Sequence, residues 1–263
     1  MAVDATSPFF DWVFYILQNY WPLFLRGATV TLIISLTGTI VGFALGILIG
    51  VVRTIPVDQN SHFIKKLGLK VVNFLLLCYI EIFRGTPMMV QAMVIFYGAA
   101  MVYNIHLSPL YAGIFIVSIN TGAYMAEIVR GGIISIDKGQ FEAAHSIGMT
   151  HAQTMLNIVL PQAIRNILPA LSNEFVINIK DTSVLNVISV TELFFMSKSA
   201  AGNNFRYFEV FLVTCVIYFI MTFTVTRILR YFEVRLEGPS AYTIHGSQTV
   251  PEAEIKIMGR EKK

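Results

Sequence analysis

The sequence has little charge and almost no cysteine. Asp, Glu, Lys and Arg make up 13% of the 263 residues, whereas hydrophobic residues make up 55%. The mean hydropathy of +0.66 is well above that of an ordinary soluble domain, so the composition places the chain among membrane proteins. Both cysteines, Cys78 and Cys215, lie in apolar runs without a CxxC pair, so we interpret them as packing residues.

Motifs of catalytic chemistry are also missing. The chain has no GxxxxGKS or GxxxxGKT loop for nucleotide phosphates, no HExxH and no GxSxG. We therefore predict that it is not an enzyme and holds no cofactor of its own. His145 and His151 are six positions apart across a glycine turn, which is poor ligand spacing and predicts no metal site. The basic residues flank apolar runs and form no stripe, which predicts no nucleic-acid partner.

Long apolar runs predict membrane-spanning helices. Residues 27–52 carry no charge, and about 18 such residues are enough to cross roughly 30 Å of hydrocarbon. Further runs cover 71–102, interrupted by RGTP at 84–87, and 109–130, 165–190 and 206–230. Lys and Arg collect in the loop 53–70 and again after residue 226, and the positive-inside rule puts both regions in the cytoplasm if 71–102 crosses once. The sequence thus predicts an all-α integral membrane protein with five transmembrane helices.

In this topology the N-terminus lies outside and the C-terminus is cytoplasmic. Residues 1–22 contain no Lys or Arg and several aromatic residues, so we predict an extracytoplasmic, interfacial N-terminal segment and no cleaved signal peptide. The transmembrane domain is expected over 23–236. The remaining residues, 237–263, are predicted to form a polar cytoplasmic tail.

Glycines recur every fourth residue in the first predicted span, at positions 38, 42, 46 and 50. This spacing places them on one face of a helix, where small residues let a second helix approach closely. We predict a helix-packing role for this strip.

The loop 131–164 is expected on the cytoplasmic side and carries two helix-start signals. Asp137 with Gln140 predicts a cap for a short helix over 138–147, which Gly148 would end in a left-handed turn. Thr150 with Gln153 predicts a second start, and Pro161 is expected to end that helix. A helix this short needs a partner surface to be stable, and Phe141 offers it an apolar contact.

The stretches EAAHSIG (142–148) and IVLP (158–161) resemble the EAA loop of the membrane subunits of ATP-binding-cassette (ABC) importers. Three other stretches are similar to motifs of the polar amino-acid uptake subfamily: IFRGTPMMVQ (82–91), AYMAEIVRGGIISI (123–136) and IKDTSVLNVISVTEL (179–193). The resemblance extends over about residues 20–236.

The resemblance implies a type I-like importer in a prokaryotic cytoplasmic membrane, surrounded by lipid. The short helix would be a coupling helix that docks on a separate ATPase subunit, which would hold ATP and Mg. The expected coupling residues are Phe141, Glu142, Ala143, Ala144, Gly148, Leu160 and Pro161. The other implied partners are a second permease subunit, identical or homologous, and an extracytoplasmic substrate-binding protein.

Charged residues inside the spans are costly and should face protein or a water-filled path. Glu174, Asn178 and Asp181 are spaced i, i+4 and i+7, so they share one helix face that suits an ammonium group. By resemblance they are candidates for a substrate path. The alternative is a structural role in helix or subunit contacts. Two further pairs, Glu81 with Arg84 and Glu127 with Arg130, have i, i+3 spacing and are expected to be structural.

The function predicted from these features is translocation of polar amino acids, with glutamine or glutamate favoured, by alternating access driven by the ATPase subunit. A rival is a secondary carrier driven by an ion gradient through Glu127, Glu174 or Asp181. It would leave the EAA loop unexplained, and we find no convincing internal repeat of the kind that many carriers have.

Overall fold

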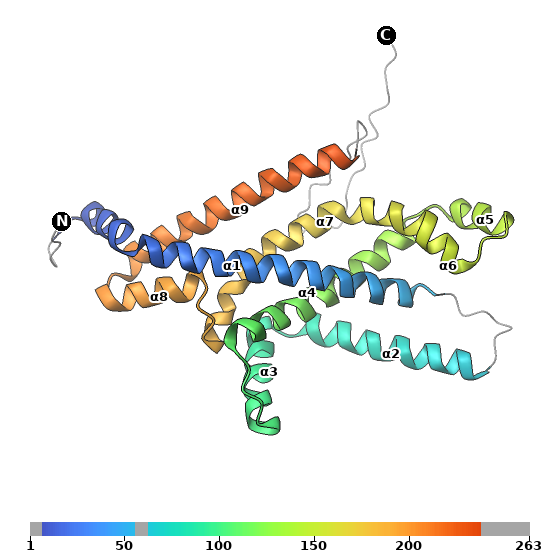
Figure 1. Cartoon of the computed structure of the whole chain (residues 1–263), viewed down its shortest axis with the longest axis horizontal. Coiled ribbons are helices and arrows are strands. Elements are labelled where there is room, and N and C mark those ends of the chain that lie inside the picture. Colours follow the sequence, from blue (N-terminus) through green and yellow to red (C-terminus); the bar gives the residue numbers. More distant parts are fainter. Residues whose placement is uncertain (1–6, 56–62, 238–263) are drawn as a thin grey trace, which may run out of the picture.

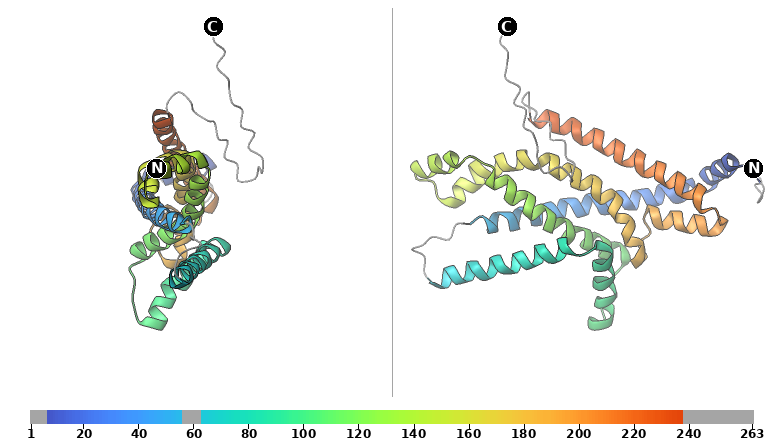
Figure 2. Two further views of the ribbon diagram at one scale, coloured as in Figure 1. Left: turned by 90° about the vertical axis from the view of Figure 1, so that its right-hand side faces the viewer. Right: turned by 180° about the vertical axis from the view of Figure 1, so that it is seen from behind.

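The computed structural model describes residues 7–55 and 63–237, and the regular elements in this part are all helical (Figure 1). The helices are α1 Phe9–Arg53, α2 Phe63–Gly85, α3 Met88–Tyr103, α4 Pro109–Ile134, α5 Lys138–Ser146, α6 His151–Thr154, a π-helical stretch Met155–Val159, α7 Leu160–Asp181, a 3₁₀ stretch Thr182–Ile188, α8 Leu193–Asn204 and α9 Tyr207–Glu237. The short helices α5 and α6 lie at one end of the molecule, and α8 lies near the other (Figure 1, Figure 2). The tail is predicted over 237–263; Glu237 ends α9, and residues 238–263 lie outside the described part.

The packing of α1 against α4 forms the centre of the fold. The glycines at 38, 42, 46 and 50 face Val117, Thr121, Met125 and Val129 of α4 respectively. A Cβ added to Gly42 would lie 2.6 Å from the Cβ of Thr121, closer than side-chain carbons come to each other. The predicted packing role of the glycine strip is therefore confirmed, since only a bare backbone leaves room for α4 at this distance.

Three described helices are long and apolar enough to cross a membrane, namely α1, α4 and α9. A fourth span results if the segments 151–188 and 193–204, which meet at 56°, count as one broken span. The expected run 71–102 is divided into α2 and α3, so the number of five spans stays a prediction. α1 already begins at Phe9 and continues past Pro22, so the expected N-terminal segment is largely part of this helix.

The break between α2 and α3 is stabilised by side-chain amides. Helix α2 ends at Gly85, just before Thr86 and Pro87, and Figure 1 shows α3 turning away from α2 at a steep angle. The amide nitrogen of Gln91 donates to the backbone carbonyls of Phe83 and Thr86, at 2.9 and 2.8 Å. The amide nitrogen of Asn120 in α4 donates to the Gln91 carbonyl oxygen at 2.9 Å. Carbonyls that the break leaves without helix partners are thus satisfied.

A buried glutamate connects α8 with α9 at the other end of the bundle, and α1 contacts the start of α8 beside it. Glu192 is fully buried and caps α8, accepting bonds from the backbone N–H groups of Phe194 and Phe195 at 2.8 and 2.7 Å. The Tyr218 hydroxyl of α9 donates to the same carboxylate at 3.0 Å, and Thr31 of α1 accepts from the Leu193 N–H at 3.2 Å. Glu192 belongs to the motif stretch 179–193, but no residue spacing in that stretch predicted that it would cap a helix.

We expect Glu192→Ala to destabilise the protein by about 3 kcal/mol, since it leaves two half-buried N–H groups and a hydroxyl without an acceptor. Thermal unfolding of the detergent-solubilised protein should detect the loss. The matched control is Thr191→Ala, because Thr191 precedes it and is exposed. Equal melting temperatures for the two variants would contradict the importance of this cap.

Candidate functional site: the coupling loop and the polar face of α7

The loop helix α5 is defined by a cap at each end. The Asp137 side chain accepts a hydrogen bond from the Gly139 N–H at 2.7 Å. At the other end Gly148 has a φ of +81°, and the Met149 N–H donates to the Ala144 carbonyl at 3.1 Å. This is the bonding of a Schellman turn, in which glycine supplies the left-handed residue. The predicted helix and its glycine stop are confirmed to within one residue.

The second start is also confirmed, but its predicted end is wrong. Thr150 and Gln153 form a reciprocal capping box, with bonds of 3.3 and 2.9 Å. The chain then stays helical through Pro161 as far as Asp181. The π-helical stretch directly before Pro161 shifts the backbone bonds at this point, and Pro161 lies in the first turn of α7, where a missing N–H costs little.

The seven predicted coupling residues fall into two groups. Glu142, Ala143, Gly148 and Pro161 are exposed, whereas Ala144 and Leu160 are buried and Phe141 is half-buried. Ile147, which was not predicted, is 78% exposed beside Gly148. An isoleucine this exposed at the tip of a loop is suited to a partner surface, and its place directly before the glycine was the signal available in the sequence.

The buried group fixes the loop to the membrane helices. Phe141 packs on a cluster that combines the end of α4 with the π-helical stretch and the start of α7; its buried members include Ile133, Ile136, Met155, Val159 and Leu160. A force applied to α5 would therefore reach α4 and α7 through direct packing. Phe141 stabilises the loop from inside, a role that differs from the outward contact expected for it.

The polar face of α7 is partly occupied by helix contacts. The Asn178 amide nitrogen donates to the hydroxyls of Thr39 in α1 and Thr121 in α4, at 2.8 and 2.9 Å. Glu174, four residues earlier, is 8% exposed, and Asp181 at the end of α7 is exposed. In the described ranges no group of three His, Cys, Asp or Glu side chains is placed to hold a metal ion. Asn178 thus connects three helices, as the structural alternative expected, whereas Glu174 and Asp181 take no part in these contacts.

Glu127 bridges two arginines near the end of α4 that leads into the loop. Its carboxylate pairs with Arg130 at 3.0 Å, as the spacing predicted, and also with Arg53 at the end of α1. The Arg53 contact was not predicted because it joins residues far apart in the sequence. This triad joins the ends of α1 and α4 beside the coupling loop.

The second predicted pair does not form. Glu81 and Arg84, both within the described residues, make no ion pair, and the Arg84 guanidinium lies 5.5 Å from the centre of the Tyr124 ring. A guanidinium over an aromatic face is a favourable cation–π contact. Arg84 thus contacts Tyr124 of the neighbouring helix α4 and not Glu81 of its own helix.

The chain is similar to permease proteins of amino-acid transport systems. The chain is 37% identical to the glutamine transport system permease protein GlnP of Escherichia coli over 232 residues, which cover 87% of this chain and 98% of GlnP. It is 33% identical to the L-cystine transport system permease protein TcyB of Bacillus subtilis, with 84% and 89% of the two chains covered.

Solved structures show the same fold. A crystal structure of an amino acid ABC transporter with histidines matches with a TM-score of 0.74 and 35% identity, covering 89% of this chain and all of that one. A methionine ABC transporter in an inward-facing conformation matches with a TM-score of 0.62 at 18% identity, which speaks for the fold alone. The expected all-α permease fold is confirmed.

A family model described as "binding-protein-dependent transport system inner membrane component" matches residues 67–238. This range contains the coupling loop, the polar face of α7 and the whole of α9. Neither the family nor these relatives give support to an ion-driven carrier. The chain belongs to the family of inner membrane components of binding-protein-dependent transport systems.

Proposed function

We propose that this chain is the permease subunit of an ABC importer for polar amino acids, with glutamine favoured as substrate. The single observation that carries the proposal is the capped EAA helix α5, whose surface is largely exposed. It lies in a chain that is similar to GlnP over 98% of the length of GlnP. The transporter would contain two permease subunits and two ATPase subunits, and an extracytoplasmic binding protein would deliver the amino acid.

Coupling to the ATPase would use the exposed residues of the loop. Ala143 and Gly148 have little or no side chain, so the ATPase could approach the backbone closely. Glu142 adds a charge, and Ile147 supplies an apolar side chain that could enter a groove of the ATPase. Because the inner side of α5 is packed on α4 and α7, movement of the ATPase subunits would shift these helices together. This arrangement requires the loop and the tail to be cytoplasmic and the N-terminus to be outside.

The substrate would pass close to the carboxylates of α7. Glu174 and Asp181 lie on either side of Asn178 in the sequence, and no hydroxyl or amide partner is seen for them among the described residues. An amino acid brings an α-ammonium group that can pair with such carboxylates. Exposure of Asp181 in a single subunit is consistent with a path that lies between two permease subunits.

The proposal is tested by uptake into proteoliposomes that contain this chain with its ATPase and binding protein. We expect labelled glutamine to accumulate only with ATP on the ATPase side, and an ionophore that dissipates ion gradients should leave the rate unchanged. Other polar amino acids, tested in the same assay, would define the specificity. Uptake that needs an ion gradient and proceeds without ATP would overturn the proposal.

A further inference from the structure

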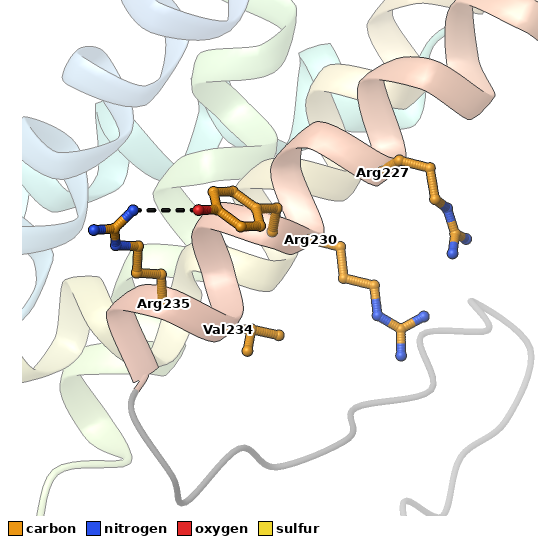
Figure 3. A pocket seen from close by; sticks show the side chains of 5 residues that line it. Arg227, Arg230, Val234 and Arg235 are labelled. Carbon is orange, nitrogen blue, oxygen red and sulfur yellow. Dashed lines mark hydrogen bonds between the residues drawn. The ribbon is translucent and has the colours of Figure 1, made fainter.

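Three arginines lie near the end of α9, Arg227 and Arg230 on one side of the helix and Arg235 on the other beside Tyr231, and none is used by the coupling loop or the α7 face (Figure 3). Arg227, Arg230 and Arg235 are all exposed and border a shallow hollow with Tyr231 and Val234 (Figure 3). The Arg235 guanidinium donates to the Tyr231 hydroxyl at 3.2 Å, and the Arg227 guanidinium lies 5.2 Å from the centre of the Phe223 ring. No carboxylate of the described residues forms an ion pair with any of the three.

The position of these arginines along α9 corresponds to the edge of a membrane. The uncharged run 210–226 would extend about 26 Å as a helix, close to the roughly 30 Å of a hydrocarbon core. Arg227 is the next charge after this run. Arg230 and Arg235 lie about 4.5 and 12 Å further along the helix axis, and the length of the arginine side chain lets their guanidinium groups reach back toward the headgroups.

The arginines continue an exposed apolar face of α9. Val216, Ile220 and Phe223 are each at least 50% exposed, and their spacing puts them on the same side of the helix as Arg227 and Tyr231. Only 22% of the apolar window of this helix is buried. A lipid whose chains lie along the apolar part would have its headgroup at the arginines.

We propose that this cluster, the α9 arginine site, binds the phosphate of an anionic phospholipid headgroup. A guanidinium has several N–H donors in a plane and matches phosphate oxygens in pairs, and the three arginines outnumber Glu233, which forms no ion pair with them among the described residues. Tyr231 is of the type enriched at membrane interfaces. The inference does not depend on the proposed transport function, since it uses only the spanning helix and its charges.

The test is titration of the purified full-length protein with lipid, followed by native mass spectrometry. Phosphatidylglycerol should bind to the wild type, and R227Q/R230Q/R235Q should weaken this affinity about tenfold while binding of phosphatidylcholine stays the same. The control R26Q/K70Q/K198Q removes three exposed positive charges at other places and should keep the wild-type affinity. Equal losses in both triple variants would overturn the site, because they would reflect net charge alone.

Two further measurements make the outcome decisive. Raising the salt concentration should weaken phosphatidylglycerol binding to the wild type and leave phosphatidylcholine binding unchanged, a result that needs no variant. Inorganic phosphate is added as a competitor in the same titration. If phosphate at low millimolar concentration displaces the lipid completely, the site binds free anions and the lipid assignment is wrong.

Discussion

Replacing Gly148 by aspartate is expected to abolish ATP-driven uptake while the protein remains in the membrane. Gly148 has a φ of +81°, a region in which an L side chain costs about 1–2 kcal/mol. Its backbone also completes the turn that ends α5. The new carboxylate would stand on the exposed surface beside Ile147, where we place the ATPase contact. The change therefore affects both the shape and the charge of the coupling surface.

Alanine variants separate the backbone effect from the charge. Gly148 and Gly131 both have open space around the position of a Cβ, but only Gly148 has a positive φ. Gly148→Ala should reduce uptake several-fold through the turn alone, whereas Gly131→Ala, in the last turns of α4, should leave it unchanged. Uptake and binding-protein-stimulated ATP hydrolysis are measured for each variant. Normal coupling in Gly148→Asp would contradict the role assigned to the loop.

Local signals in the sequence predicted much of this region. Asp137, Gly148 and the Thr150–Gln153 pair act through neighbours within a few residues, so their effect on the backbone follows from their spacing. The glycine strip was predictable for a related reason, because a four-residue repeat of small residues has one main use in a membrane helix. Pro161 was misread because the π-helical stretch before it depends on packing between α4 and α7.

Apart from the local cap formed by Glu192, the contacts that sequence reasoning missed join distant segments. Glu127 pairs with Arg53 across 74 positions, and Asn178 binds Thr39 across 139. Neither partner is marked by a local pattern, since any hydroxyl or guanidinium on the facing helix would have served. The choice between a substrate contact and a helix contact for Asn178 therefore required the arrangement of α1, α4 and α7 in space.

The second large effect, a loss of stability, is expected where Gly46 of α1 packs against α4. Gly46→Leu should lower the melting temperature by roughly 10 °C, as expected for overpacking that costs about 3 kcal/mol. A Cβ at this position would lie 2.8 Å from the backbone carbonyl carbon of Met125 and 3.0 Å from the nitrogen of Ala126. Backbone atoms cannot rotate away as a side chain can, so α1 and α4 would have to separate.

Separation at Gly46 would also break the polar contacts on either side of it. Thr39 and Arg53 lie seven residues before and after Gly46, so all three residues share one face of α1. Thr39 binds Asn178 of α7, and Arg53 pairs with Glu127 of α4. The matched control is Gly98→Leu in α3, where a Cβ meets no atom within 4 Å. If Gly46→Leu melts like Gly98→Leu, close α1–α4 contact is not what positions the polar face of α7 and the start of the coupling loop.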